Sequence, residues 1–137
     1  MPSRKVALSA PSPEFLEFWA EPHRCTLTTV RPDGTPHVVP VNSMLDAATG
    51  IARVLSSSTS HKVRQVRAAG ESGARVALCQ VDGRRWSTVE GVAVVRDDPG
   101  AVADAESRAT HRYGRPPRPN PRRVVLEITA TRVLSNL

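Results

Sequence analysis

The stretch Ile51-Ala-Arg-Val-Leu-Ser-Ser-Ser-Thr-Ser-His-Lys-Val-Arg-Gln-Val-Arg-Ala-Ala69 combines three kinds of local structure in one short segment. Residues 51–55 favour a strand, and residues 56–60 form a turn made wholly of hydroxyl side chains. Residues 61–69 favour a short helix with its valines on one face. Gly70 suits the left-handed residue just beyond the end of that helix.

The start of this helix has the features of an anion-binding site. The backbone N–H groups of a first helical turn have no partner within the helix and attract negative charge. Hydroxyl groups of the preceding turn lie close to them, and Lys62 adds an ammonium group. A phosphate is the simplest ligand for such a set. The alternative is an ordinary loop in which Thr59 or Ser60 caps the helix.

The rest of the chain predicts a mainly β protein. We expect further strands at residues 24–30, 36–44, 74–81, 85–96 and 124–130, and further helices at residues 13–21 and 99–113. Together with residues 51–55 this gives six mostly antiparallel strands with inserted helices, as in a small closed or split β-barrel. We assign the barrel to residues 14–137 and expect a flexible N-terminus at residues 1–13.

Two residues predict irregularities in this barrel. Pro40 cannot donate a ladder hydrogen bond, so its strand should lie at an edge or be interrupted there, which leaves backbone groups free for a ligand. Gly91 stands in the middle of the longest predicted strand and favours a bend of the kind that barrel closure needs.

Length and charge limit the classes of function. The chain has 137 residues, enough for one domain, and a net charge of +6 carried almost wholly by arginine. The arginines are scattered and only 4% of the residues are aromatic, which disfavours nucleic acid and favours an anionic small molecule. The basic, proline-rich segment 115–123 is either a linker or a rigid grip on carboxylates and phosphates. No apolar run resembles a signal peptide or a membrane span, so we expect a cytoplasmic protein without membrane contact.

Side chains that would carry out a reaction themselves are not apparent. Cys25 and Cys79 lie in predicted strands and are expected to be reduced and buried. The histidines have no cysteine or carboxylate at metal-ligand spacing, so we predict no metal site and no catalytic residue. Nucleotide-binding glycine motifs are missing as well. A chain that can hold an anion but lacks reactive groups suggests that a bound cofactor carries the chemistry.

Four segments resemble the pyridoxamine-phosphate-oxidase-like split barrels, the FMN-binding split-barrel fold. They are Cys-Thr-Leu-Thr-Thr-Val-Arg-Pro-Asp-Gly-Thr-Pro-His-Val-Val-Pro-Val (25–41), Ile-Ala-Arg-Val-Leu-Ser-Ser-Ser-Thr-Ser-His-Lys (51–62), Gln-Val-Asp-Gly-Arg-Arg-Trp-Ser-Thr-Val-Glu-Gly-Val-Ala-Val (80–94) and Arg-Pro-Asn-Pro-Arg-Arg-Val-Val-Leu-Glu-Ile (118–128). Within that superfamily the chain most resembles the flavin/deazaflavin oxidoreductases that use coenzyme F420, in the subgroup that contains the F420-dependent biliverdin reductases.

The resemblance implies a homodimer with cofactor sites at the subunit interface and hydride transfer from reduced F420 to an electron-poor acceptor, such as biliverdin. It places the phosphate of the cofactor on Lys62 and the hydroxyl turn, and the deazaflavin ring along the second strand. Arg122 or Arg123, from the same or the other subunit, would face the cofactor tail or an acidic substrate. The full set of implied cofactor-binding residues is His37, Val39, Pro40, Val41, Asn42, Arg53, Ser57, Ser58, Ser60, Lys62, Gln80, Trp86, Arg122 and Arg123.

Three alternatives stay open at this point. The same barrel could bind FMN as an oxidase or reductase, although true pyridoxamine phosphate oxidases carry a C-terminal extension beyond the last strand. A non-catalytic carrier of F420 or a tetrapyrrole would also need few reactive side chains. A nucleic-acid-binding barrel is disfavoured by the missing aromatic platforms.

Overall fold

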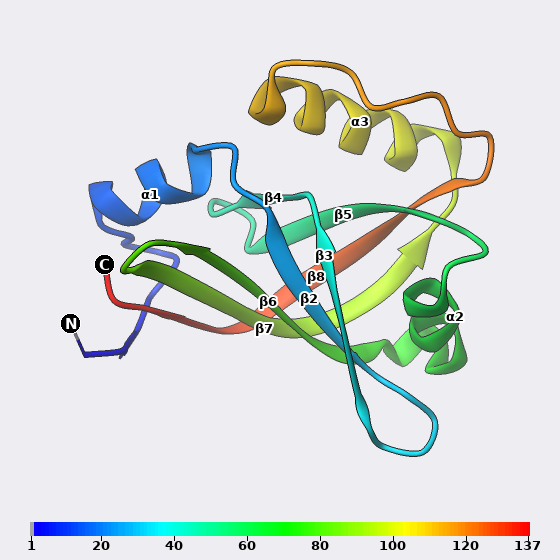
Figure 1. The fold of residues 1–137 in the computed structure, drawn as a ribbon, viewed down its shortest axis with the longest axis horizontal. Helices are drawn as coiled ribbons and strands as arrows, with labels where there is room; N and C mark the ends of the chain where they lie inside the picture. Colours follow the sequence, from blue (N-terminus) through cyan, green and yellow to red (C-terminus); the bar gives the residue numbers. More distant parts are fainter. Residues whose placement is uncertain (1) are drawn as a thin grey trace.

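A computed structural model describes residues 2–137 as one curled antiparallel sheet with three α-helices packed around it (Figure 1). The helices are α1 (Pro13–Ala20), α2 (His61–Ala68) and α3 (Pro99–Tyr113), and a 3₁₀ turn, η1 (Gly70–Ser72), follows α2. The strands are β1 (Arg4–Lys5), β2 (Cys25–Val30), β3 (Pro36–Val41), β4 (Ser43–Asp46), β5 (Ile51–Ser57), β6 (Ala74–Asp82), β7 (Arg85–Arg96) and β8 (Arg123–Ser135).

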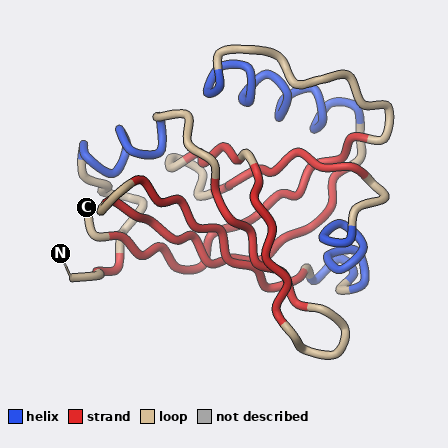
Figure 2. Tube along the Cα trace, in the orientation of Figure 1, coloured by secondary structure: helices blue, strands red, loops and turns tan. Residues whose placement is uncertain are grey.

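The order of the strands makes the sheet a split barrel. Neighbouring strands follow the path β3-β2-β6-β7-β8-β5-β4, and β1 pairs with β8. The two strands at the ends of this path, β3 and β4, are separated in the chain by Asn42 alone. The sheet must therefore curl until its two edges approach each other, as Figure 2 shows, although no ladder joins β3 to β4 within residues 2–137. The predicted mainly β split barrel is confirmed.

The number of strands differs from the prediction: eight instead of six in the described part of the chain. The expected strand 36–44 divides at Asn42, just after Pro40, so that β3 lies at the edge of the sheet. Arg4–Lys5, within the segment expected to be flexible, forms a short strand against β8. The flexibility of residues 1–13 as a whole stays a prediction, and Met1 lies outside the described residues.

Gly91 stands at the irregularity that the sequence predicts. The pairing of β7 with β8 shifts register between Glu90 and Gly91, and β8 then continues to Ser135. A Cβ atom on Gly91 would lie 2.4 Å from the backbone oxygen of Thr129 in the neighbouring strand. Only glycine permits this close approach of the two strands, which bends the sheet towards closure.

The helices close the ends of the barrel and cover part of its outside. The amphipathic helix α1 buries Phe15 and Trp19 in the core, where Trp19 Nε1 donates a hydrogen bond of 3.0 Å to Ser87 Oγ. Helix α2 buries Val63 and Val66 in the same core. Helix α3 instead lies on the outer face of β4, β5 and β8, over a smaller apolar cluster. None of these three helices has the length and apolar character that crossing a membrane requires.

Candidate functional site

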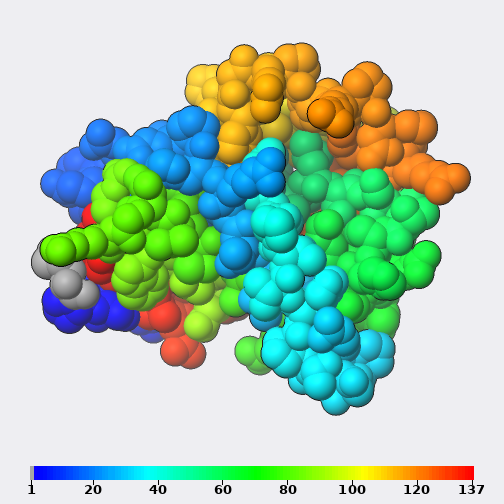
Figure 3. Space-filling view, in the orientation of Figure 1, coloured from blue at the N-terminus to red at the C-terminus, as the bar shows by residue number. Residues whose placement is uncertain are grey.

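A cleft of about 650 Å³ lies at the split of the barrel. Its floor is formed by the junction of β3 and β4 and by the end of β5, and its walls by the start of α2, the end of α3 and the proline-rich segment that follows α3. Figure 3 shows this segment in orange above the green residues of α2 and the cyan residues of β3. The lining residues are Arg24, Pro40, Val41, Asn42, Met44, Leu55, Ser56, Ser57, Ser60, Lys62, Ala109, Tyr113, Arg115, Pro116, Pro117, Arg118, Asn120 and Arg123.

The cleft is strongly basic. Its lining includes five cationic side chains, Arg24, Lys62, Arg115, Arg118 and Arg123, and no carboxylate among residues 2–137. Of these five, only Arg123 is in an ion pair with a described residue, with Nη1 2.6 Å from the Glu106 carboxylate on α3. Because the other four cations are not neutralised by a described carboxylate within 4.0 Å, the cleft attracts and concentrates anions.

Lys62 is the cation at the start of α2. Its ammonium group is half-buried, and this burial lowers the pKa of Lys62 below its usual value. Desolvating a charge without a partner costs free energy, and an anionic ligand would recover that cost. Lys62 is therefore a candidate for binding an anion, because its ammonium group is half-buried and has no described carboxylate within 4.0 Å.

The hydroxyl turn lies beside Lys62, but its serines do not cap the helix as one alternative expected. Ser60 occupies the N-cap position of α2, yet its side chain makes no capping hydrogen bond. Its Oγ lies 3.0 Å from Ser56 Oγ instead. The donors of the first turn of α2 are therefore not used by this side chain, which is the arrangement a bound anion requires.

The proline-rich segment is fixed to the hydroxyl turn by two hydrogen bonds. Asn120 Nδ2 donates to Ser57 Oγ at 2.8 Å, and the Ser58 backbone N–H donates to the Arg122 carbonyl at 2.8 Å. Arg123 holds the same segment to α3 through its ion pair with Glu106. The segment is thus a wall of the cleft, with Arg115 and Arg118 in the lining.

The structure brings half of the expected cofactor-binding residues to this cleft. Those in the lining are Pro40, Val41, Asn42, Ser57, Ser60, Lys62 and Arg123. Those outside the lining formed by this chain are His37, Val39, Arg53, Ser58, Gln80, Trp86 and Arg122. For both groups a role in cofactor binding stays a prediction, and for the first group the structure shows only that the residues line one cleft.

Three of the outlying residues have other partners in this chain. Arg53 is on the α3 side of β5, with Nε 3.7 Å from the Asp104 carboxylate. Gln80 is completely buried, and its Nε2 donates to the Phe18 carbonyl at 2.8 Å. Trp86 is at the start of β7, opposite Val81 and beside the C-terminal residues.

The end of α3 contributes two residues that the sequence did not single out. The Tyr113 hydroxyl lines the cleft, donates to the His23 carbonyl at 2.9 Å and accepts from the Ser43 N–H at 3.1 Å. Burial raises the pKa of Tyr113. Arg112 donates to the backbone carbonyls of Glu21 and Ser43 and to the Gln80 side chain. These partners are far away in the sequence, so no local pattern could have indicated them.

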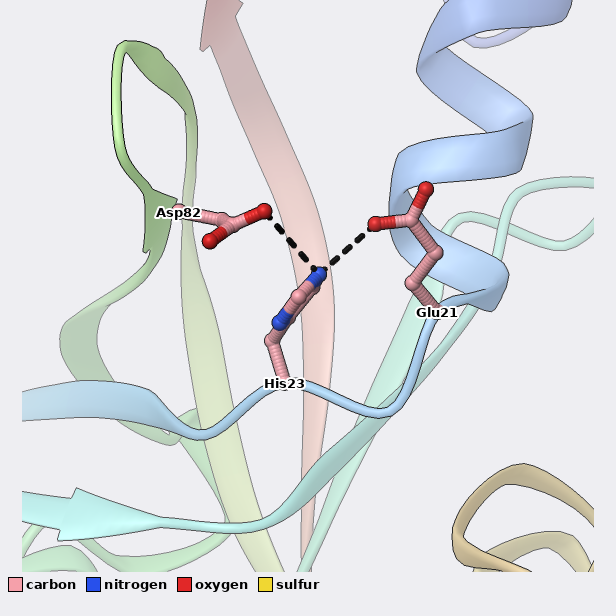
Figure 4. Close-up of side chains that lie close together, drawn as sticks. All are labelled: Glu21, His23 and Asp82. Atoms are coloured by element: carbon pink, nitrogen blue, oxygen red, sulfur yellow. Dashed lines mark hydrogen bonds and ion pairs between the residues drawn. The ribbon is translucent and has the colours of Figure 1, made fainter.

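Glu21, His23 and Asp82 form the one group of possible metal ligands found in residues 2–137, with ligand atoms within 4.8 Å of one another (Figure 4). Arg85 donates to Glu21 at 2.7 and 3.0 Å and also binds Asp82. The guanidinium of Arg85, with His23, holds the pKa of Glu21 at about 2. Because Arg85 forms ion pairs with both carboxylates, the group is an ion-pair network that fastens the end of α1 to the hairpin of β6 and β7.

A split barrel with a basic cleft at its open edge, and with donors arranged for a phosphate, defines a cofactor- or anion-binding barrel. Comparison with known proteins identifies the family: the chain belongs to the pyridoxamine 5'-phosphate oxidase family, whose sequence profile matches residues 11–136. The predicted resemblance is confirmed.

A curated relative is similar to this chain over most of its length. The chain is 49% identical over 125 residues to the F420H(2)-dependent biliverdin reductase of Mycobacterium tuberculosis (strain CDC 1551 / Oshkosh), covering 91% of this chain and 88% of the relative. Among solved structures, an F420 reductase superposes with a TM-score of 0.70 at 24% identity, covering 90% of this chain and 98% of that one. A conserved hypothetical protein from Mycobacterium tuberculosis gives a TM-score of 0.74 at 24% identity, covering 95% and 87%. These structures support the fold.

Proposed function

We propose that this protein is an F420-dependent reductase and that biliverdin is its acceptor. The observation that carries the proposal is the 49% identity, over 91% of the chain, to a protein named F420H(2)-dependent biliverdin reductase. The basic cleft supports it independently, because F420 is an anionic cofactor and the lining contains cations without a described carboxylate.

The residues at the start of α2 fit the phosphate of the cofactor. Lys62 would neutralise its charge, while Ser57, Ser60 and the first backbone N–H groups of the helix would donate hydrogen bonds. Arg53 and Ser58, which are outside the cleft lining, would contact the phosphate only after a local rearrangement or from the other subunit.

The edge of β3 fits a ring with alternating donors and acceptors. Pro40 lies opposite Thr26 and has no N–H, so this is a pair without mutual hydrogen bonds, and the backbone of Pro40 faces away from β2. Hydrogen-bonded and non-hydrogen-bonded pairs alternate along an antiparallel ladder, so Val38, two residues before Pro40, also points its N–H and its carbonyl away from β2. The free edge therefore offers one donor and two acceptors next to the cleft, and Asn42 follows at the split. We place the deazaflavin ring along this edge.

Reduced F420 would supply the hydride, and the protein would supply position and charge. Biliverdin carries two propionates, and Arg24, Arg115 and Arg118 are the cleft cations available for them. Fixing donor and acceptor in contact removes an entropic barrier of several kcal/mol, about 7–11 kcal/mol in the best-oriented cases. The same arginines would stabilise the negative charge that the acceptor gains as the hydride arrives.

We also propose a homodimer. Val30, Val38 and Val81 are about half exposed, at 50%, 56% and 58%, on the adjoining strands β2, β3 and β6. Burying such side chains against a second copy is favourable, and Val38 is in the edge strand β3, whose Pro40 and Val41 line the cleft. A cytoplasmic location stays a prediction.

Two measurements test the proposal, first of binding and then of turnover. The purified chain is titrated with F420 and with FMN, and binding is followed by fluorescence. Reduced F420 and biliverdin are then added, and bilirubin formation is followed by absorbance. Bilirubin formation supports both the proposed cofactor and the proposed acceptor. F420 binding without turnover would indicate a carrier, and FMN binding without F420 binding would overturn the choice of cofactor.

A further inference from the structure

A second pocket, of about 420 Å³, lies between α2 and the hairpin of β2 and β3. It is lined by Arg31, Pro32, His37, His61, Arg64, Gln65 and Ala68, none of which lines the basic cleft. Successive residues of the first turns of α2 face different sides: Lys62 lines the cleft, whereas His61 and Arg64 line the second pocket. The two pockets are therefore neighbours on opposite sides of one helix but share no side chain.

The lining of this second pocket is also basic. Arg31 and Arg64 are its charged residues, and no described carboxylate lies within 4.0 Å of either. Arg31 is held in place because its Nη1 donates to the Pro36 carbonyl across the turn at 2.6 Å. The nearest acidic residue of the turn, Asp33, accepts hydrogen bonds from the Thr35 N–H and hydroxyl at 3.0 and 2.6 Å and is not part of the lining.

Gln65 holds His37 beside the pocket. The Thr29 hydroxyl donates to Gln65 Oε1. His37 Nδ1 lies 3.3 Å from Gln65 Nε2 and 3.4 Å from Gln65 Oε1. The other ring nitrogen, Nε2, has no hydrogen-bond partner among the described residues, and it is a donor in the tautomer in which Nδ1 accepts from Gln65. The His61 ring stands at 84° to the His37 ring, with the centroids 6.3 Å apart.

From these contacts we infer that the second pocket is an oxyanion site, which binds a phosphate or carboxylate group through Arg31, Arg64 and His37. Two guanidinium groups and an imidazole N–H are all donors, and the carboxylates that would compete for them are missing from the described lining. The shared chemistry allows two sources: a small free polyanion, or the acidic tail of a cofactor whose phosphate lies across α2 on Lys62. The inference stands on this pocket alone and does not depend on the proposed function.

Inorganic pyrophosphate is the probe, and calorimetry on the full chain is the measurement. Lys62→Met first weakens the cleft by removing one of its five cations, and the difference that Arg64→Gln makes in that background reports the second pocket. Arg64→Gln is then added in that background, and Arg67→Gln serves as the matched control, because Arg67 is on the same helix but is outside the lining and pairs with Asp97. We expect Arg64→Gln to weaken the remaining site about fivefold or more, as for a lost charge-assisted hydrogen bond at a partly exposed site. Arg67→Gln should leave it within twofold.

Two results would overturn the inference: no pyrophosphate binding in Lys62→Met at millimolar concentration, or equal weakening by the two arginine substitutions. Histidine ring resonances give an independent check, since pyrophosphate should shift those of His37 and His61 in Lys62→Met and leave His111 unmoved.

F420 species with one and with several glutamates distinguish the two sources. If the tail occupies the pocket, Arg64→Gln weakens only the species with the longer tail. If a free anion occupies it, Arg64→Gln leaves both F420 affinities unchanged, and pyrophosphate binds to the F420 complex.

Discussion

Replacing Lys62 with alanine should weaken F420 binding strongly without weakening the fold. The ammonium group is half-buried and has no described carboxylate within 4.0 Å, so its interaction with a phosphate would be close to a full charge-assisted hydrogen bond. Such bonds contribute about 1.5–3 kcal/mol. At about 1.4 kcal/mol per tenfold change, the dissociation constant should rise roughly tenfold to a hundredfold or slightly more.

Fluorescence titration with F420 measures this change, and Lys5→Ala is the matched control. Lys5 is the only other lysine, so its replacement removes the same charge from the chain at an exposed position in β1, away from the cleft. Lys62→Met keeps most of the aliphatic stem and should behave like Lys62→Ala. A dissociation constant that changes less than threefold in Lys62→Ala, or equally in both alanine variants, would refute the placement of the phosphate.

Replacing Lys62 should weaken ligand binding but should not lower the stability of the fold. Burial lowers the pKa of Lys62 in the folded chain, so the unfolded chain binds the proton more tightly. The charge therefore opposes folding at neutral pH, and this penalty fades only as the pH rises from the lowered pKa through the ordinary value of 10.5. Without ligand, the urea midpoint of Lys62→Met at neutral pH should be equal to or higher than that of the wild type. A clearly lower midpoint would show that Lys62 serves the fold instead of a ligand.

Three further substitutions test the framework around the site by urea denaturation. Tyr113→Phe removes the hydroxyl that bonds the backbone of Ser43 and should lower the free energy of unfolding by about 1–3 kcal/mol; an unchanged value would mean that water replaces it freely. Gly91→Ala places a methyl group 2.4 Å from a backbone oxygen of β8 and should cost about 1–3 kcal/mol, whereas an unchanged midpoint would contradict the close approach. Arg85 lowers the pKa of Glu21 from 4.5 to about 2, so the carboxylate stabilises the fold above pH 4.5 and loses this effect as the pH falls towards 2. The stability difference between the wild type and Glu21→Gln should shrink over that range, and a constant difference would refute the role of the ion pair.

The sequence predicted those parts of the fold that depend on local pattern. The alternation of apolar and polar residues predicted the strands of the barrel, Pro40 predicted the edge strand and Gly91 predicted the bend. Pro40 and Gly91 could be interpreted from the sequence because each acts through its own backbone. The start of the helix at His61 and its lysine were found for the same reason. The short strand Arg4–Lys5 was missed because it exists only through its pairing with the far end of the chain.

The arginines of the cleft show where sequence reasoning stopped. The proline-rich segment has no helical or strand periodicity, so its sequence does not say which side chains face the barrel. Arg123 was expected at the ligand, and it does line the cleft, but its guanidinium is paired with Glu106 from another element. Arg24 was not singled out, because its place beside the split depends on the pairing of Cys25 with Val41. Choosing among the arginines therefore required the tertiary structure.

The end of α3 holds the backbone at the split, where the ligand is expected. β3 and β4 are joined by Asn42 alone, so they cannot pair with each other, and Ser43 begins β4 directly after this junction. Both polar groups of that backbone are already used: Tyr113 accepts from the N–H, and Arg112 donates to the carbonyl. Because buried backbone groups need a partner and these have theirs, Tyr113 and Arg112 satisfy the backbone of Ser43 without a further strand. The free edge of β3, with Pro36 and Pro40 lacking N–H groups, is a poor template for a further strand and remains accessible to a planar ligand.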